Sequence, residues 1–273
     1  MTTPRTSRVT LATLRAMRQA REPIALLTCY DFPTAQILEG IGIPLLLVGD
    51  SAANTVLGLA STREIPPDFL LTLTVAVRRG APNVFLLADM PYRAMASIAA
   101  AVAMGQRFIG EASADAVKIE IAEGDVGFVA ALVAAGIPTC AHLGLLPQRV
   151  TSPDGYKAQG RTAEAASTLV QTALACVSAG AQMLLLEAVP DEVTREISSR
   201  VDVPVFGCGA GPSADGHVVV LHDMLGFNSK PPRFVEVLGD LPAALRQAAT
   251  RYLEAITTRA YPAPKHTYKM KSE

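Results

Sequence analysis

The segment 84-VFLLADMP-91 is a short apolar run that ends in a carboxylate, Asp89. An unbroken run of this kind is typical of a strand buried on both faces, as in a parallel sheet. Three further apolar runs lead to Asp50 (45-LLLVGDS-51), Glu120 (117-VKIE-120) and Glu187 (183-MLLLEAVP-190). Because a buried unpaired charge is costly, these four acids are poor core residues. They indicate carboxylates that converge at one end of a sheet, as in a metal or acid/base site.

Eight apolar runs with strand character alternate with segments of helical pattern. Strands are expected at residues 24–30, 45–50, 84–89, 116–120, 137–143, 182–188, 203–207 and 217–223. Helices are expected after a Thr10 cap and at residues 34–42, 68–80 (with Asp68 as a candidate cap), 95–110, 125–135, 163–179, 190–199 and 241–259, with a polar loop over 51–67. Strict alternation predicts right-handed crossovers and a parallel sheet. Eight units in 273 residues favour an α/β fold closed into a (β/α)8 TIM barrel.

The bulk composition excludes several classes of protein. The net charge is −1 without a long basic block, and Trp is absent, which argues against a nucleic-acid or acidic-membrane partner. The start of the chain has no apolar segment of a signal peptide, and no apolar run approaches the ~20 residues of a membrane span. The scattered cysteines, which have no CxxC spacing, are expected to be buried reduced thiols: Cys29, Cys140, Cys176 and Cys208. We expect one soluble cytoplasmic barrel domain over residues 1–273, with an N-terminal helix and a polar C-terminal tail.

Active sites of (β/α)8 barrels lie at the C-terminal ends of the strands. The side chains expected there are Asp50, Asp89, Lys118, Glu120, His142 and Glu187. Lys118 and Glu120 are two residues apart on one strand, so both are expected to face the barrel axis. One lysine among four acids requires a further positive charge or a protonated acid. Because the acids offer oxygen ligands without Cys, a hard ion such as Mg²⁺ suits this site better than Zn²⁺.

Each candidate also has a purely structural interpretation. A single Asp at a strand end, such as Asp50 or Asp89, is more often the N-cap of the following helix. His142 alone is more often a satisfied core or loop histidine. The segment 207-GCGAG-211 resembles the phosphate-binding loops of barrels, but its glycines could equally serve tight packing. The acids taken together are explained poorly by capping, so a functional site is the stronger interpretation.

Several motifs, in this order, resemble those of the ketopantoate hydroxymethyltransferase family. They run collinearly from about residue 9 to residue 266: 48-VGDS-51, 77-VRRGAPN-83, 86-LLADMP-91, 117-VKIE-120, 141-AHLGLLPQRV-150, 155-GYKAQGR-161, 183-MLLLEAVP-190, 209-GAG-211 with 215-DG-216, and 222-HDMLGF-227. The resemblance implies a barrel of the phosphoenolpyruvate/pyruvate superfamily. It also implies an enzyme that transfers a hydroxymethyl group from 5,10-methylenetetrahydrofolate to 3-methyl-2-oxobutanoate. The product is 2-dehydropantoate, on the way to pantothenate and coenzyme A, and it forms through a Mg-stabilised enolate.

The resemblance assigns roles to the strand-end residues. Asp50, Asp89 and Glu120 match the family's Mg²⁺ ligands, with one ion expected per subunit, and Asp50, Ser51, Asp89 and Lys118 match its contacts to the oxo acid. Glu187 matches the catalytic base, and its apolar neighbours are expected to raise its pKa. His142 is a candidate for contacting these residues without touching the substrate or the metal itself. The family also implies a cytoplasmic homodecamer whose partners are its small-molecule substrates.

Three segments depart from the family pattern. Ile121-Ala122 stands where the family usually has two glycines, Leu59-Ala60 replaces a His/Tyr-Asp pair, and 151-TSPDGY-156 lacks the usual first loop glycine. Because the first of these adjoins an expected metal ligand, the backbone path there could differ. The departures therefore leave an alternative open, in which a divergent paralogue catalyses another C–C bond reaction on a 2-oxo acid without folate.

Overall fold

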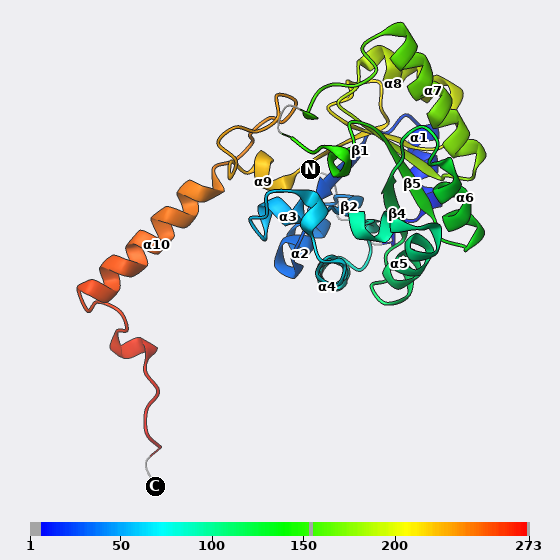
Figure 1. The fold of residues 1–273 in the computed structure, drawn as a ribbon. Helices are drawn as coiled ribbons and strands as arrows, with labels where there is room; N and C mark the ends of the chain where they lie inside the picture. The colour runs from blue at the N-terminus through cyan, green and yellow to red at the C-terminus, as the bar shows by residue number, and fades with distance from the viewer. Residues whose placement is uncertain (1–6, 153–154, 272–273) are drawn as a thin grey trace. The chain divides into compact units, whose positions relative to one another are not determined.

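Eight parallel strands form a closed barrel in the computed structural model, which describes residues 7–152 and 155–271 (Figure 1). The strands are β1 (Ile24–Thr28), β2 (Leu45–Val48), β3 (Phe85–Asp89), β4 (Ala116–Glu120), β5 (Thr139–Gly144), β6 (Met183–Glu187), β7 (Val205–Cys208) and β8 (Gly216–Val219). Each strand pairs with the next in the chain, and β8 pairs with β1 to complete the ring. The predicted barrel is confirmed.

Helices follow most strands and surround the barrel (Figure 1). The α-helices are α1 (Leu11–Gln19), α2 (Phe32–Gly40), α3 (Ala52–Thr55), α4 (Pro67–Gly80), α5 (Ile98–Gly110), α6 (Val126–Ala134), α7 (Ala163–Ser178), α8 (Asp191–Arg200), α9 (Leu221–Met224) and α10 (Leu241–Thr257). Short 3-10 turns are η1 (Thr62–Glu64), η2 (Tyr92–Ala96), η3 (Pro147–Arg149) and η5 (Pro264–His266). The predicted Thr10 cap is confirmed, because its hydroxyl accepts a hydrogen bond from the Thr13 amide.

The structure corrects three details of the sequence prediction. The expected strand over 217–223 ends at Val219, where its pairing with β1 stops, and α9 begins at Leu221. The expected loop over 51–67 contains α3 and η1. Asp68 does not cap α4, which begins after Pro66. Residues 209–215, all of them described, join β7 to β8 without a helix, and no helix was expected there.

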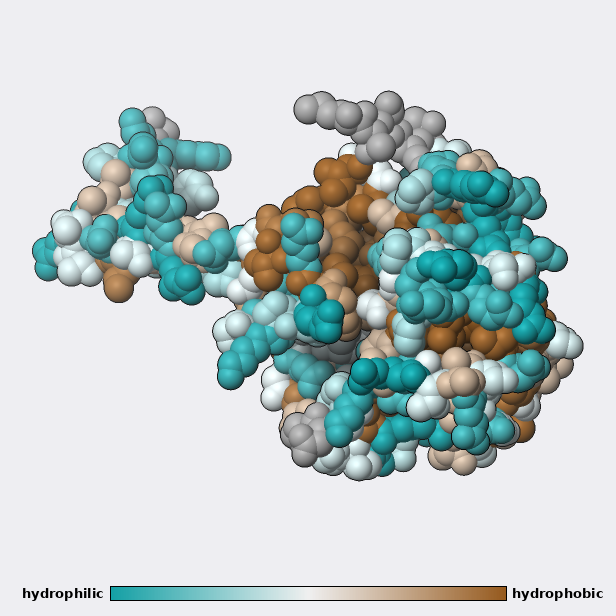
Figure 2. Space-filling view, turned by 90° about the horizontal axis from the view of Figure 1, so that it is seen from above, coloured by the Kyte–Doolittle hydropathy of each residue, from teal (hydrophilic) through white to brown (hydrophobic). Residues whose placement is uncertain are grey.

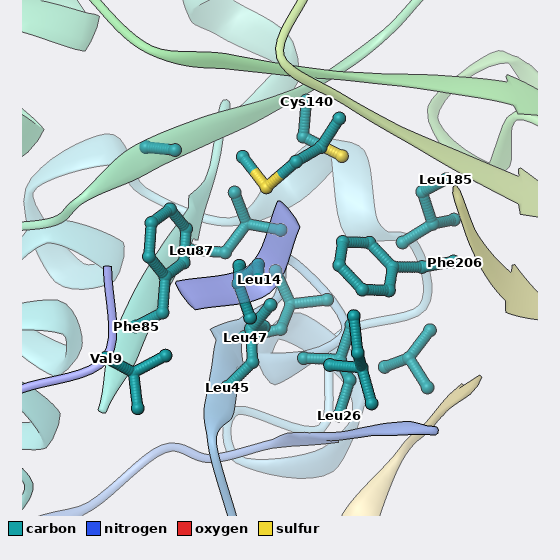
Figure 3. Close-up of a cluster of buried hydrophobic side chains, with 14 of the residues drawn as sticks. Val9, Leu14, Leu26, Leu45, Leu47, Phe85, Leu87, Cys140, Leu185 and Phe206 are labelled. Atoms are coloured by element: carbon teal, nitrogen blue, oxygen red, sulfur yellow. The ribbon is translucent and has the colours of Figure 1, made fainter. Parts of the chain in front are cut away.

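The barrel interior is filled by apolar side chains that alternate along the strands. The buried cluster takes two residues, i and i+2, from several strands. Figure 3 shows Leu45 with Leu47 and Phe85 with Leu87, and Met183 and Leu185 form a further pair. Phe206 of β7 and Cys140 of β5 also belong to the cluster. Since side chains in a strand alternate between faces, the next residue at i+2 on each strand also points inward. This period sets which side chains reach the C-terminal end of the barrel.

Helix α1 covers the N-terminal end of the barrel. Its Leu14 and Met17 belong to the same buried cluster as the strand residues. Arg18 on α1 pairs with Asp215, directly before β8, and its guanidinium donates to the carbonyls of Ser198 and Val201 at 2.7 and 2.6 Å. These partners all precede strands, so α1 closes the end opposite the strand-end acids.

The described chain divides into two compact units, residues up to Val220 and residues from Leu221 onward. The first unit holds all eight strands. In the second unit, α10 buries none of its residues within the described chain. The surface in Figure 2 is mixed, with hydrophobic residues visible between hydrophilic ones. No helix among the described residues is long and apolar enough to cross a membrane.

Closure of the barrel predicts a strict requirement for glycine at position 216. Gly216 lies opposite Ile24 of β1, and a Cβ at this position would lie 2.1 Å from the Ile24 carbonyl oxygen. Because the obstacle is backbone, Gly216→Ala should lower the free energy of unfolding by about 1–3 kcal/mol, as overpacking does. Urea unfolding followed by circular dichroism measures this change.

Gly110→Ala is the matched control. Gly110 ends α5, and no described atom lies within 4 Å of a Cβ placed there. This substitution should leave stability unchanged or raise it by about 0.5–1 kcal/mol, since Ala is the better helix former. Equal stabilities of the two variants would contradict the closure argument.

Candidate active site

Ionisable side chains form the layer directly above the apolar core of the barrel. On β4, Ala116 belongs to the buried cluster, and Lys118 and Glu120 follow at the same period of two. Asp89 likewise follows Leu87, His142 follows Cys140, and Glu187 follows Leu185. The expectation that these side chains gather at the C-terminal end is confirmed. The strand register dictates their neighbours, because Asp89 is paired with Lys118 and Glu120 with His142.

Lys118 and Asp89 form a buried ion pair at the centre of this layer. Lys118 Nζ lies 2.9 Å from Asp89 Oδ1, and both side chains are almost fully buried. Burial raises the pKa of Asp89 to about 7, against the opposing effect of Lys118. Burial alone would lower the pKa of Lys118, but the charges of Asp89, Asp50 and Glu120 outweigh it and raise that pKa. Lys118 is therefore a permanent buried cation.

His142 links Lys118 to Glu187. Its Nδ1 lies 3.2 Å from Lys118 Nζ, and its Nε2 lies 3.2 Å from Glu187 Oε2. Burial, followed by the Lys118 charge, holds the pKa of His142 well below its usual range, so the imidazole is neutral. An ammonium can only donate, so Nδ1 accepts from Lys118 and the ring proton resides on Nε2. His142 is a buried histidine, and it lies next to two ionisable groups of the site, Lys118 and Glu187.

Glu187 ends β6 at the edge of this layer. Its side chain is 17% exposed, and burial raises its pKa to about 7, as predicted from its apolar neighbours. Its backbone is fixed from β5, because the Leu145 amide donates to the Glu187 carbonyl at 2.8 Å. A Cβ at neighbouring Gly144 would lie 2.3 Å from the same oxygen, so only glycine permits this approach. The result is a carboxylate that exchanges a proton near neutral pH.

Gln148, on η3, was not identified from the sequence. It is buried, and its side-chain amide donates to Asp50 Oδ2 at 2.9 Å and to the Met90 carbonyl at 2.8 Å. Its backbone amide donates to both oxygens of Glu120, at 3.1 and 3.2 Å. Gln148 thus holds two acids of the site from one position. Gln148 lies within the family-like motif 141-AHLGLLPQRV-150, but neither this motif nor its place in the loop after the His142 strand distinguished it from an exposed loop residue.

Asp50 and Ser51 follow β2 and join the site through hydrogen bonds. The Asp50 amide donates to Asp89 Oδ2 at 3.1 Å, and the Ser51 hydroxyl lies 2.7 Å from the Tyr30 hydroxyl. Neither Asp50 nor Asp89 caps a helix with its side chain, so the capping interpretation is wrong for both. The layer therefore contains all seven predicted residues, with Tyr30 and Gln148 as additional members.

The carboxylates offer a chemically suitable environment for Mg²⁺. Burial, followed by the charge of Asp50, raises the pKa of Glu120 well above its usual range. Asp89 Oδ1 is buried, with Lys118 Nζ 2.9 Å away. No three His, Cys, Asp or Glu side chains of the described chain are grouped closely enough to hold a metal by themselves. Mg²⁺ usually uses one or two carboxylates together with water and substrate oxygens, so the residues present fit this ion.

The glycine-rich loop after β7 packs against α8. A Cβ at Gly211 would lie 2.4 Å from Cβ of Asp191, and Asp191 Oδ1 accepts from the Ser213 amide at 2.8 Å. Thr194 donates to the Ala210 carbonyl at 2.6 Å. Of the two interpretations of this loop, the contacts within the protein support packing.

Solved structures with the same fold include a hydrolase, a mutase and a lyase. The chain matches a phosphonopyruvate hydrolase at 14% identity and a TM-score of 0.64, over 94% of this chain and 92% of that one. It matches the phosphoenolpyruvate phosphomutase of Streptomyces platensis subsp. rosaceus at 15% identity and a TM-score of 0.63, over 93% and 92%. It also matches a 2,3-dimethylmalate lyase described as a PEP mutase/isocitrate lyase superfamily member, at 14% identity and a TM-score of 0.61, over 98% and 93%. At this identity, these likenesses show the fold alone.

Sequence comparisons extend over almost the whole chain. The 3-methyl-2-oxobutanoate hydroxymethyltransferase of Geobacillus kaustophilus is 42% identical over 259 residues, covering 94% of this chain and 93% of that protein. The protein of the same name from Bacillus subtilis is 40% identical over 256 residues, covering 93% and 92%. Residues 8–264 match the family model for ketopantoate hydroxymethyltransferase. The chain therefore belongs to the ketopantoate hydroxymethyltransferase family.

Proposed function

We propose that the protein transfers a hydroxymethyl group from 5,10-methylenetetrahydrofolate to 3-methyl-2-oxobutanoate, giving 2-dehydropantoate. The observation that carries this proposal is the inward layer of ionisable side chains, in which Glu187 lies next to His142 and has a pKa of about 7. A carboxylate with this pKa suits removal of a weakly acidic proton next to a ketone. The family membership of the chain supports the choice of substrates.

In this mechanism, Glu187 removes the C3 proton of the oxo acid. The neutral His142 lies beside this carboxylate, with Nε2 3.2 Å from Glu187 Oε2, and adds no charge next to the base. The buried Lys118 ammonium stabilises the negative charge that develops on the oxygen of the resulting enolate. Ser51, held by the Tyr30 hydroxyl, and the neighbouring Asp50 contact the oxo acid beside Lys118. These groups are in place before substrate binds, which lowers the reorganisation that the reaction requires.

Asp50, Asp89 and Glu120 are the residues that would hold one Mg²⁺ per subunit. When bound, the ion would supply Lewis-acid stabilisation of the oxo and carboxylate oxygens of the substrate. Gln148 fixes two of the three carboxylates, because it donates to Asp50 and to Glu120. Its role is to position them.

The transfer balances with one water molecule. The enolate carbon forms a bond to the methylene carbon of the folate, and both C–N bonds of that carbon break in the course of the reaction. Water supplies the hydroxyl group of the product, and the folate nitrogens take up protons to give tetrahydrofolate. Water must therefore reach the site after the C–C bond forms. Before that step, the site must keep water away from the enolate.

We further propose a cytoplasmic homo-oligomer, decameric as in the family pattern. Ile37 and Ile41 are 65% and 57% exposed at positions four apart on and next to α2. In the second unit, Leu245 and Leu253 of α10 are 60% and 65% exposed. Apolar helix faces of this kind are typical of surfaces buried between subunits. The free, mostly buried cysteines agree with a reducing compartment.

Proton NMR of 3-methyl-2-oxobutanoate in D₂O tests the proposal. With enzyme and Mg²⁺, the C3 proton signal should disappear, and addition of methylenetetrahydrofolate should produce 2-dehydropantoate. Glu187→Gln should slow the exchange by about a hundredfold or more, because general-base catalysis contributes about 10²–10⁴-fold. Its affinity for the oxo acid should stay nearly unchanged.

Glu192→Gln is the control for this substitution, since Glu192 is an exposed acid in the first turn of α8. It should exchange the proton at the native rate. Native exchange by Glu187→Gln would eliminate Glu187 as the base. Exchange without any folate-dependent product would instead indicate the divergent oxo-acid enzyme.

The pKa of Glu187 predicts a pH dependence. Glu187 must be ionised to accept a proton, and burial raises its pKa to about 7. At saturating Mg²⁺, kcat/KM for exchange should therefore rise about tenfold per pH unit below pH 7 and level off above it. Saturation with the ion separates this effect from protonation of Asp89, whose pKa is also raised to about 7. A flat profile between about pH 6 and pH 8 would contradict the assignment.

The contacts of Gln148 predict a role in Mg²⁺ affinity. Gln148→Ala removes the donor to Asp50 Oδ2 and should weaken Mg²⁺ binding by about 10–100-fold, as loss of a residue that orients a ligand does. Isothermal titration calorimetry with Mg²⁺ alone measures this without turnover. Gln106→Ala, at an exposed position of α5, should bind the ion normally. Native affinity of Gln148→Ala would refute the positioning role.

A further inference from the structure

A cavity of about 390 Å³ lies at the C-terminal end of the barrel. Four successive loops line it: Arg63 comes from η1 after β2, Tyr92 and Met95 from η2 after β3, Phe128 from α6 after β4, and Gln148 from η3 after β5. Its volume falls within the range of about 300–1,000 Å³ that is typical of small-molecule sites. All of these residues belong to the first compact unit.

The cavity meets the ionisable layer at Glu120 and Gln148. Both line it, although both are almost fully buried. The predicted base and the central ion pair, Glu187 with Lys118 and Asp89, are not among the described residues that line it. The cavity therefore adjoins the oxo-acid site on the β4 side, and does not coincide with it.

The walls of the cavity suit a flat aromatic ligand. Tyr92 and Phe128 offer aromatic faces, and Met95 supplies a polarisable side chain that adapts to ring edges. The guanidinium of Arg63 lies 4.2 Å from the centre of the Tyr92 ring and donates to the Tyr92 hydroxyl at 2.7 Å. Stacking holds Arg63 in place over the cavity while some of its five donors stay available.

Arg63 is also a cation without a neutralising acid. Arg149, the other arginine of the cavity, pairs with Asp125. Within the described chain, Arg63 has no carboxylate at ion-pair distance, and its polar contact is the Tyr92 hydroxyl. A cation stacked on an aromatic ring and free of counter-charge is suited to an incoming carboxylate.

We propose that this cavity binds the reduced folate, with the pterin beside Glu120 and Gln148 and the glutamate carboxylates at Arg63. The inference rests on the proposed function, because that reaction requires a bulky aromatic anion next to the oxo acid. A pterin at the Glu120 end brings the one-carbon unit next to the carboxylates that would bind the oxo acid. The aminobenzoyl ring then lies against Tyr92 and Phe128.

The cavity is bordered by two of the segments that depart from the family pattern. Residues 52–62 lead directly into Arg63, and Ile121-Ala122 lead into the turn of Asp125. The Ala122 amide donates to Asp125 Oδ2 at 3.2 Å, and that carboxylate also binds Arg149. Two of the three departures thus adjoin segments that line the cavity, while the residues of the oxo-acid layer are retained.

Steady-state kinetics with two folates test the assignment. Native enzyme should have a lower KM for methylenetetrahydrofolate than for methylenetetrahydropteroate, which lacks the glutamate. Arg63→Ala should raise the KM for methylenetetrahydrofolate by about tenfold, the effect expected from the loss of a hydrogen bond between charged groups. It should leave the KM for the pteroate compound unchanged, so that the difference between the two folates disappears.

Arg93→Ala is the matched control, because Arg93 is an exposed arginine next to Tyr92 in η2 and is not a lining residue. It should keep both KM values. Arg63→Ala should also keep the folate-independent, Mg²⁺-dependent exchange of the C3 proton, which shows that its oxo-acid site is intact. An unchanged KM for methylenetetrahydrofolate in Arg63→Ala would overturn the inference, as would equal increases for both folates.

The same assays distinguish the two proposals. If native enzyme forms 2-dehydropantoate but Arg63→Ala does so with native KM values, the reaction stands and the cavity assignment fails. If native enzyme forms no product from either folate, the proposed function itself fails.

Discussion

Excess negative charge in a buried place is the constraint on which this site depends. One ammonium, that of Lys118, faces Asp89, Asp50 and Glu120 at the end of the barrel. It cannot balance them all. Burial raises the pKa values of Asp89 and Glu120, whereas burial and the Lys118 charge keep the imidazole of His142 neutral. A bound cation, or a proton on one of the acids, completes the balance. The whole layer lies directly above the apolar core of the barrel.

Much of this arrangement follows from a period of two residues along parallel strands. Once Ala116 is inside the barrel, Lys118 and Glu120 must be inside too, one and two steps nearer its mouth. For this reason, the barrel and the strand-end residues could be predicted from runs such as 84-VFLLADMP-91. A local sequence pattern is enough to predict where a side chain points in a buried strand, because each side chain can point only into the barrel or away from it.

Other features were beyond the reach of local patterns. Gln148 acts through contacts with Asp50 and Glu120, which are distant in the chain, and an amide in a loop has no local signature of that task. The end of β8 depends on where β1 stops pairing, so the apolar run over 217–223 predicted a strand that is too long. Asp68 stands in the first turn of α4 but pairs with Arg107, an interaction between helices that its own neighbours do not reveal. In each case the deciding partner lies far away in sequence.

The position of Gln148 has a consequence for the order of events in catalysis. Its amides hold Asp50 and Glu120, and the same side chain is part of the cavity wall. A ligand in the cavity would therefore contact Gln148, the residue that positions the neighbouring acids. Energetic coupling of this kind is reciprocal, so whichever ligand binds first changes the affinity for the second by the same factor. Gln148 therefore couples the two halves of a ternary complex, although it lies in only one loop of the barrel.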